Sequence, residues 1–356
     1  MTTAIPLTVL TGFLGSGKTT LLKRLLADPA MAGTAIIINE FGEVGLDDAL
    51  IERAEEDILL LPSGCVCCAV RGDLVAALAR LHTQMLAGLI PPLRRVVLET
   101  SGLADPAPIA HTIMTEEAVY RIYSLDGIVT TVDAELGSGQ IATQFEPAKQ
   151  IAIADRIVIT KTDRAAPALA SALEARLRVL NPGAVILRGV RGDVPAGQLI
   201  GLGTHEPVLA RVDAERWLAA DAHAGDHEHT HAHGDQCAPD CGDAHLKNET
   251  PTGHLHGIQS FSLAYDQPLD GNALQLAMQT LAAAYGGKLL RVKGLLDVAG
   301  HDTPIVVHGV QHIFYPFDRL ERWPSAERRS RFVFITRDLG AEAVRRHLQP
   351  FLSAVA

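Results

Sequence analysis

The sequence predicts a mostly parallel, doubly wound α/β domain followed by a smaller α+β domain. Short apolar segments alternate with segments of helical spacing from residue 6 to about residue 190, a pattern typical of a parallel sheet with helices on both faces. After residue 257 the strands follow one another with few helices between them, which is typical of an α+β arrangement. A His-rich stretch separates the two regions, so we expect domains at 1–210 and 257–356 joined by a linker at 211–256.

The first strand and the first helix enclose a glycine-rich loop. Residues 7–10 form an apolar strand, residues 20–26 begin a helix, and the sequence between them fits the pattern G-x-x-x-x-G-K-[ST]. Glycines let the backbone turn tightly so that successive N–H groups point at phosphate oxygens, and the helix N-terminus adds its dipole. An ordinary glycine-rich turn is the alternative, but the place between a strand and a helix favours a phosphate-binding loop.

We therefore interpret the first domain as a P-loop NTPase domain. The residues expected to bind the nucleotide in this loop are Gly12, Gly15, Ser16, Gly17, Lys18, Thr19 and Thr20. Lys18 is expected to reach the β- and γ-phosphates, and the Thr19 hydroxyl is expected to bind Mg²⁺.

The remaining elements alternate along the chain. In the first domain, strands are predicted at 35–39, 58–61, 95–99, 128–133, 156–160 and 184–187, and helices at 74–86 and 165–180. After the linker, strands are predicted at 257–264, 289–298, 305–308 and 331–336, and helices at 272–285 and 341–352. In doubly wound sheets the ligand binds beyond the carboxyl ends of the strands, which is where the P-loop lies.

Two strands end in carboxylates. Glu99 ends one of them, where it can hold the Mg²⁺ shell or a water, and Gly102 just after it can let the loop respond to a γ-phosphate. Asp133 ends the other, and for this residue we favour a capping or turn role.

An acidic, glycine-containing loop at 39–48 follows the second strand, a position that suits a switch segment, although a solvated loop would have the same composition.

Thr160, Lys161 and Asp163 follow a further strand. An aspartate at that place can accept hydrogen bonds from both the ring N–H and the exocyclic amine of guanine, a pair of donors that adenine does not offer. The alternative is that Thr162 or Asp163 caps the helix that follows.

The five cysteines occur in two close groups, which in a cytosolic chain indicates metal or redox chemistry rather than a disulfide framework. The first group comprises Cys65, Cys67 and Cys68, and the second comprises Cys237 and Cys241. Thiolates select Zn²⁺ or Cu(I) over hard cations, and Glu40 or a water would complete a tetrahedral site. Redox thiols and plain packing remain as alternatives for the first group.

Residues 221–256 are rich in histidine and acidic residues and poor in apolar ones. Such a segment cannot bury enough surface to fold alone, so we expect it to be disordered without metal. The regular His-x-His spacing predicts metal binding there, with His227, His229, His231 and His233 as the expected ligands.

Composition excludes other classes of protein. The formal net charge of −10 argues against a nucleic-acid surface, which needs clustered Lys and Arg. No apolar run reaches the 18 or so residues of a membrane span, and the N-terminus lacks the basic region of a signal peptide. We therefore expect a cytoplasmic protein that binds neither nucleic acid nor membrane.

The ordered motifs at 11–20, 39–43, 64–68, 99–106 and 160–163 together resemble the CobW-like GTPases, a family of P-loop metallochaperones. The resemblance covers nearly the whole chain. It implies GTP hydrolysis with Mg²⁺, with Lys18, Glu99 and Glu40 as catalytic residues. It also implies that Zn²⁺, or Co²⁺ in some members, binds at the Cys-x-Cys-Cys stretch and passes to a client protein that the sequence does not identify. A dimer that depends on nucleotide or metal is left open.

Two departures from the family pattern matter. Ile38 stands where some relatives carry a second glutamate, so any metal ligand at that place is lost, and Thr160 stands where many GTPases have asparagine.

Two functions of other classes compete with this interpretation. An ATP-dependent kinase or transferase would use the same P-loop without needing Asp163, and a metal storage protein would need only the His-rich segment.

Overall fold

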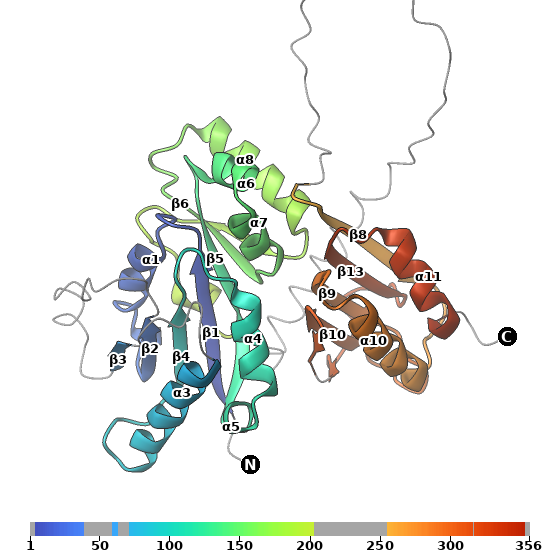
Figure 1. Ribbon diagram of the computed structural model, residues 1–356, viewed down its shortest axis with the longest axis horizontal. Helices are drawn as coiled ribbons and strands as arrows, with labels where there is room; N and C mark the ends of the chain where they lie inside the picture. The colour runs from blue at the N-terminus through green and yellow to red at the C-terminus, as the bar shows by residue number, and fades with distance from the viewer. Residues whose placement is uncertain (1–3, 39–58, 63–70, 203–254, 316, 353–356) are drawn as a thin grey trace, which may run out of the picture.

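The computed structural model describes residues 4–38, 59–62, 71–202, 255–315 and 317–352. Within these ranges the chain forms two sheets, each with its own helices (Figure 1). The fold class agrees with the prediction. The predicted boundaries at 210 and 257 stay predictions, because residues 203–254 are not described.

The first sheet is parallel throughout its described strands and has the order β3-β2-β4-β1-β5-β6-β7. Its strands are β1 (Ile5–Gly12), β2 (Thr34–Ile38), β3 (Leu59–Pro62), β4 (Arg95–Glu99), β5 (Tyr123–Asp133), β6 (Arg156–Thr160) and β7 (Val185–Arg188). Alternate residues of one strand enter different cores: Val96 and Leu98 pack on one face, and Val97 packs on the other. Because side chains alternate with period two, a continuous apolar strand indicates a sheet buried on both faces.

Helices cover both faces of this sheet (Figure 1). They are α1 (Lys18–Leu25), α3 (Arg71–Leu86), α4 (Pro106–Thr115), α5 (Glu117–Tyr120), α6 (Gly137–Thr143), α7 (Phe145–Ala152) and α8 (Pro167–Leu180), with short 3₁₀ turns at Pro29–Met31 and Ala196–Gln198. The sequence analysis predicted α1, α3 and α8 but not the four helices between β4 and β6. Those four are short, and prolines in α4 and α7 interrupt the helical spacing of apolar residues.

Strand β5 begins five residues before its predicted start at residue 128, because the polar residues at its beginning are buried with partners. Asp126 accepts hydrogen bonds from the Thr8 hydroxyl at 2.8 Å and from the Gly201 N–H at 2.9 Å. Hydrogen bonds reduce the cost of burying a carboxylate, so the strand continues through a polar sequence that is typical of a loop.

The second sheet is antiparallel, with the order β11-β10-β9-β13-β8 and β12 paired to β10. Its elements are β8 (Ile258–Tyr265), α10 (Gly271–Tyr285), β9 (Leu289–Leu296), β10 (Ile305–Val310), β11 (Ile313–Phe314), β12 (Asp318–Arg319), β13 (Ser330–Arg337) and α11 (Ala341–Leu352). One face packs under α10 and α11, with Phe332 and Phe334 at its centre. The other face contributes Leu290 and Ile335 to the core of the first domain, so the two domains share one hydrophobic contact.

A buried charge cluster lies in this contact. The Asp155 carboxylate, just before β6, pairs with Arg291 and with the Lys293 ammonium at 3.3 Å. Burial by itself would raise the pKa of Asp155, but the two cations hold it well below its usual value. The pKa of the neighbouring His308 falls to about 3, first through burial and then through the same cations, so this imidazole is neutral. A buried charge left without its partner is costly, so this cluster holds the domains in one arrangement.

Among the described residues there is no helix both long and apolar enough to cross a membrane.

Candidate nucleotide-binding site

The P-loop packs tightly against β5. Gly12 has a φ of +145°, and a Cβ there would lie 2.2 Å from the Thr131 hydroxyl oxygen and 2.7 Å from that of Ser16. Those two hydroxyls are hydrogen-bonded at 2.7 Å. Glycine is therefore required at position 12, because only a backbone without a side chain can pass between strand and loop.

Helix α1 begins directly at the loop. Gly17 is its N-cap with a φ of +93°, and no side chain caps the helix there. The first N–H groups of such a helix are a favourable place for an anion. The Lys18 ammonium, nearly buried, donates to the carbonyls of Gly12 at 2.9 Å and Phe13 at 3.4 Å, so it lies across the loop that would hold the phosphates.

Thr19 and Glu99 meet at the carboxyl ends of β1 and β4. The Thr19 hydroxyl donates to Glu99 Oε1 at 3.1 Å, and Glu99 is only 3 % exposed. The next residue, Thr100, donates from its hydroxyl to that of Thr11 at 2.8 Å. These strands are parallel neighbours, so their carboxyl ends coincide and bring together residues 80 positions apart in the chain. A hydroxyl beside a carboxylate is the kind of hard oxygen pair that Mg²⁺ prefers.

The segment after β6 is tied to the same loop. The Thr160 hydroxyl donates to the Ser16 carbonyl at 2.6 Å. The Lys161 ammonium donates to the Gly15 carbonyl at 2.8 Å and to Asp133 Oδ2 at 2.6 Å. Threonine thus provides a direct hydrogen bond to the P-loop at the position where many GTPases have asparagine. The segment predicted to read the base and the loop predicted to hold the phosphates form one connected structure.

Asp133 has the turn role that the sequence favoured. Its Oδ1 accepts from the N–H groups of Glu135 at 2.8 Å and Leu136 at 3.2 Å, while its Oδ2 binds Lys161. Burial by itself would raise the pKa of Asp133, but the hydrogen bonds and the Lys161 charge lower it below its ordinary value. The carboxylate therefore stays ionised and orients Lys161.

The alternative of a helix cap at Thr162 or Asp163 is wrong. Helix α8 begins at Pro167 with Ala166 as its N-cap and no side-chain cap. The Thr162 hydroxyl lies 3.4 Å from the Gly189 carbonyl instead, and the Asp163 side chain is exposed. A proline in the first helical turn needs no capped N–H, which is why the helix starts later than predicted and leaves Asp163 outside it.

The loop after Glu99 lies against the P-loop. A Cβ on Gly102 would lie 2.7 Å from the Leu14 backbone nitrogen and equally close to the Leu14 side chain, so only glycine fits there. On its other side, the Gln150 carboxamide donates to the carbonyls of Gly102 at 3.2 Å and Ala104 at 3.0 Å. The sequence analysis did not identify Gln150 or Thr131, because neither belongs to a motif.

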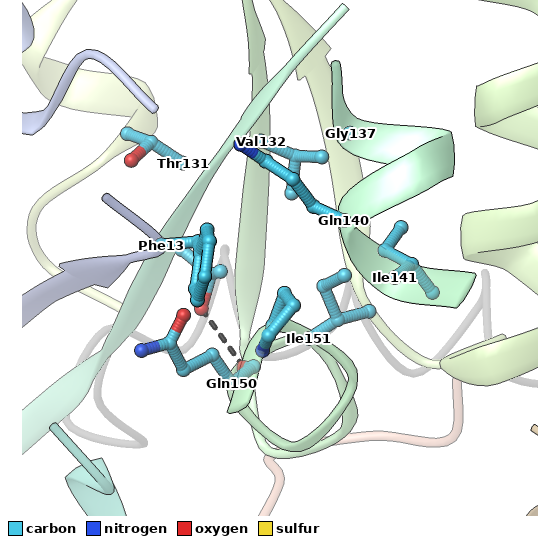
Figure 2. Close-up of a pocket in the computed structure, with 10 residues that line it drawn as sticks. Phe13, Thr131, Val132, Gly137, Gln140, Ile141, Gln150 and Ile151 are labelled. Atoms are coloured by element: carbon cyan, nitrogen blue, oxygen red, sulfur yellow. Dashed lines mark hydrogen bonds between the residues drawn. The ribbon is translucent and has the colours of Figure 1, made fainter. Parts of the chain in front are cut away.

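A small cavity lies between the P-loop, α6 and α7 (Figure 2). Its lining includes Phe13, Gln140, Ile141, Gln150 and Ile151, and its volume is about 10 Å³. That is room for roughly one water molecule. This cavity is therefore a packing feature behind the P-loop and not the place of the nucleotide.

Sequence profiles assign both parts of this chain. The CobW/HypB/UreG nucleotide-binding domain matches residues 6–188, which contain the P-loop and all of the described parallel sheet except the first residue of β1. This chain belongs to the CobW/HypB/UreG family. The C-terminal domain of the cobalamin synthesis protein CobW matches residues 258–352.

Two relatives of this family match over nearly their full length. The zinc chaperone YjiA of Escherichia coli K12 is 33% identical over 345 residues, which cover 96% of each chain. The zinc chaperone CobW of Pseudomonas aeruginosa is 28% identical over 384 residues, covering 98% of this chain and 92% of the relative. The crystal structure of the Zn(II)-bound YjiA GTPase from E. coli aligns with a TM-score of 0.67 and 29% identity, over 98% and 99% of the two chains.

Apart from Thr19, the predicted metal ligands of this CobW/HypB/UreG chain fall outside the described residues. They are Glu40, Cys65, Cys67, Cys68, His227, His229, His231 and His233. Within the described ranges, no group of three or more His, Cys, Asp or Glu side chains is arranged to hold a metal ion. The metal-binding roles of those eight residues stay predictions.

Proposed function

We propose that this chain is a GTP-hydrolysing metallochaperone whose bound zinc is controlled by the state of the nucleotide. The observation that carries the proposal is the pair of hydrogen bonds from Thr160 and Lys161 to the P-loop carbonyls of Ser16 and Gly15. They place the segment ending in Asp163 beside the phosphate loop, where an exposed carboxylate can accept both guanine donors. The relatives named as zinc chaperones, and the one named a GTPase, support the same function.

Each residue at the P-loop edge has a chemical task in this proposal. The N–H groups at the start of α1 and the Lys18 ammonium bind the phosphates. Thr20 lies in the first turn of α1 and contributes its N–H group to this site. Thr19 and Glu99 hold Mg²⁺, which supplies charge neutralisation for the phosphates when bound. Gly102, pressed against Leu14, lets the loop after Glu99 respond to the γ-phosphate.

Zinc is the cargo, and we propose that the cysteines at 65, 67 and 68 bind it together with Glu40. The segments that carry these residues leave the described sheet from two paired strand ends: Ile38 of β2 is the register partner of Pro62 of β3. Ile38 is also the register partner of Glu99. Both segments therefore start next to the Mg²⁺-binding edge, and a soft thiolate set suits Zn²⁺.

Nucleotide turnover tests the proposed function directly. Purified protein should hydrolyse GTP with Mg²⁺ and should hydrolyse ATP at least about a hundredfold less efficiently, because adenine leaves the Asp163 carboxylate unpaired. The measurement is phosphate release with each nucleotide, with and without Zn²⁺. Equal use of ATP would favour a kinase or transferase, and zinc binding without any turnover would favour a metal storage protein.

Zinc affinity should depend on the nucleotide. If metal binding favours the GTP state, GTP must tighten metal binding by the same factor, and couplings of this kind are typically about fivefold or more. We expect Zn²⁺ to bind more tightly with a non-hydrolysable GTP analogue than with GDP, measured by competition with a chelating dye. Cys67→Ser should remove this difference.

Deletion of residues 221–254 is the matched control for that experiment. It removes the proposed histidine ligands but none of the P-loop residues and none of the cysteines at 65, 67 and 68. The deletion should lower the number of zinc ions bound and leave the nucleotide dependence of the tightest site in place. The same tightest affinity with GDP and with the GTP analogue would contradict the coupling.

A further inference from the structure

Helix α7 binds the loop after Glu99 through two adjacent side chains. Gln150, which is 1 % exposed, donates both of its carboxamide hydrogen bonds to this loop, at Gly102 and Ala104. The Lys149 ammonium pairs with Asp105 at the end of the loop. Asp105 is also the N-cap of α4, with Oδ1 accepting from the Ala107 N–H at 3.1 Å. Both ends of the 102–105 segment are thus bound to one turn of α7.

Gln150 has little else to bind. Its backbone carbonyl accepts from the Thr130 hydroxyl of β5 at 2.9 Å, which fixes the helix on the sheet. Its carboxamide lies next to the Phe13 ring of the P-loop (Figure 2). Within the described part of the chain, its Oε1 has no hydrogen-bond partner. All the hydrogen bonds of this buried side chain therefore depend on the position of the loop, and a shift of the loop would leave two buried donors unsatisfied.

The first residue of the same helix is held by the second domain. The Arg337 guanidinium, at the end of β13, lies 4.3 Å from the centre of the Phe145 ring. The His256 ring meets Phe145 edge-on at 6.1 Å, and His256 Nε2 lies 2.9 Å from the Ile141 carbonyl of α6. An arginine at that distance from an aromatic ring is attracted by the ring electrons. Arg337 of the second domain and His256, just before β8, thus hold the N-terminal end of α7 from two sides.

The contacts of Phe145 with the second domain and of Gln150 with the loop lie close together on one short helix. Phe145 and Gln150 are five residues apart in one helix, about 7.5 Å along its axis. A short helix bound at both ends moves as a unit, because bending it would break its own hydrogen bonds. A displacement of the 102–105 loop therefore cannot occur without changing either the Gln150 contacts or the packing at Phe145.

We propose that α7 couples the loop after Glu99 to the C-terminal domain, with Gln150 as the residue that positions the loop. The inference rests on the proposed function, since the loop is taken to respond to the γ-phosphate. The second domain, through Arg337 and Phe145, sets the place of α7 and so the place of the loop. In return, a change of the loop on GTP binding reaches β8 and β13. Coupling of this kind requires that both sites bias the same element.

The test compares wild type with Gln150→Met, Arg337→Gln and the double variant. Gln150→Met keeps the length of the side chain and removes both donors. Arg337→Gln acts at a half-exposed side chain and leaves the core intact. Gln140→Met is the matched control, because Gln140 lines the same cavity from α6 without a side-chain hydrogen bond to the loop. The readouts are kcat and KM for GTP, and hydrogen exchange of residues 258–265 and 330–337 with GDP or a non-hydrolysable GTP analogue.

We expect wild type to show different exchange of these strands in the two nucleotide states. Gln150→Met should abolish that difference and lower kcat about tenfold or more with KM changed less than threefold, whereas Gln140→Met should do neither. Arg337→Gln should lower kcat as well, and the double variant should lose less than the product of the single losses, because both changes break the same link.

Independent losses in the double variant, or a nucleotide-dependent exchange difference that survives in Gln150→Met, would overturn the proposal. So would a wild type that binds both nucleotides with identical exchange of β8 and β13. Failure of the proposed function looks different, since the wild type would then use ATP as well as GTP or hydrolyse neither nucleotide. If Gln150→Met proves unstable in thermal unfolding, Lys149→Met takes its place, because it removes the ion pair with Asp105 by changing a side chain that is partly exposed.

Discussion

Replacement of Lys18 by methionine should lower GTP turnover by roughly a hundred- to a thousandfold, the usual cost of removing one preorganised donor from a developing charge. The Lys18 ammonium is nearly buried and lies across the P-loop, bound to the carbonyls of Gly12 and Phe13. Methionine has nearly the same length, so the packing of α1 is kept while the positive charge is removed. The measurement is single-turnover GTP hydrolysis at saturating nucleotide, together with GTP affinity.

Lys23→Met is the control for this experiment. Lys23 lies on the same helix α1 but its side chain is exposed. The same charge is removed from the same element, and turnover should change by less than about twofold, because an exposed charge is screened by solvent. A Lys18→Met protein that is folded and turns over GTP at the wild-type rate would show that the phosphates bind elsewhere.

Asp163→Asn should change the base preference from guanine to xanthine. In the proposed function the carboxylate accepts two donors of guanine, and hydrogen bonds to a charged group contribute about 1.5–3 kcal/mol each. Asparagine keeps one acceptor and puts an N–H₂ donor against the guanine amine, so GTP affinity should fall about a hundredfold or more. Xanthine has a carbonyl in place of that amine, so binding of xanthosine triphosphate should improve. Competition between the two nucleotides at equilibrium measures the change.

Glu135→Gln is the matched control for the loss of charge. Glu135 is exposed, follows β5 on the same side of the site and lies 4.0 Å from Arg164 in a weak ion pair. Its replacement removes one negative charge near the proposed base site without changing Asp163, so the ratio of GTP to xanthosine triphosphate affinity should stay as in wild type. An unchanged ratio in Asp163→Asn as well would mean that another group reads the base.

The local parts of the candidate site could be read from the sequence because each is a short contiguous motif. A strand, a glycine-rich turn and a lysine at the start of a helix are encoded within the residues around Gly12 and Lys18. The ends of β4 and β6 were placed to the residue, at Glu99 and Thr160, since a continuous apolar run that stops at a polar residue marks the carboxyl edge of a parallel strand. The parallel arrangement then implies that these ends share one edge with the P-loop.

The helices between β4 and β6 could not be read in this way. Helix α4 begins with prolines on a cap at Asp105, and α7 is only eight residues long. Prolines and short length remove the helical spacing of apolar residues on which such predictions depend. The beginning of β5 was missed for a related reason: Asp126 is polar in sequence, and only its partners Thr8 and Gly201 explain why it lies inside a strand.

By itself, the sequence determined the class of the protein, the phosphate loop and the carboxylates at the strand ends, because those features depend on neighbours within a few residues. Only the tertiary structure decided which side chains hold them in place. Gln150 reaches the Gly102 carbonyl over 48 positions of sequence, and Thr160 reaches Ser16 over 144. Asp155 meets its cationic partner Arg291 across the contact between the domains, 136 positions away. Contacts of this kind arise where packed elements meet. Buried polar groups need a hydrogen-bond partner, but any donor or acceptor that packing brings close can provide it, so no local sequence pattern predicts which residues pair.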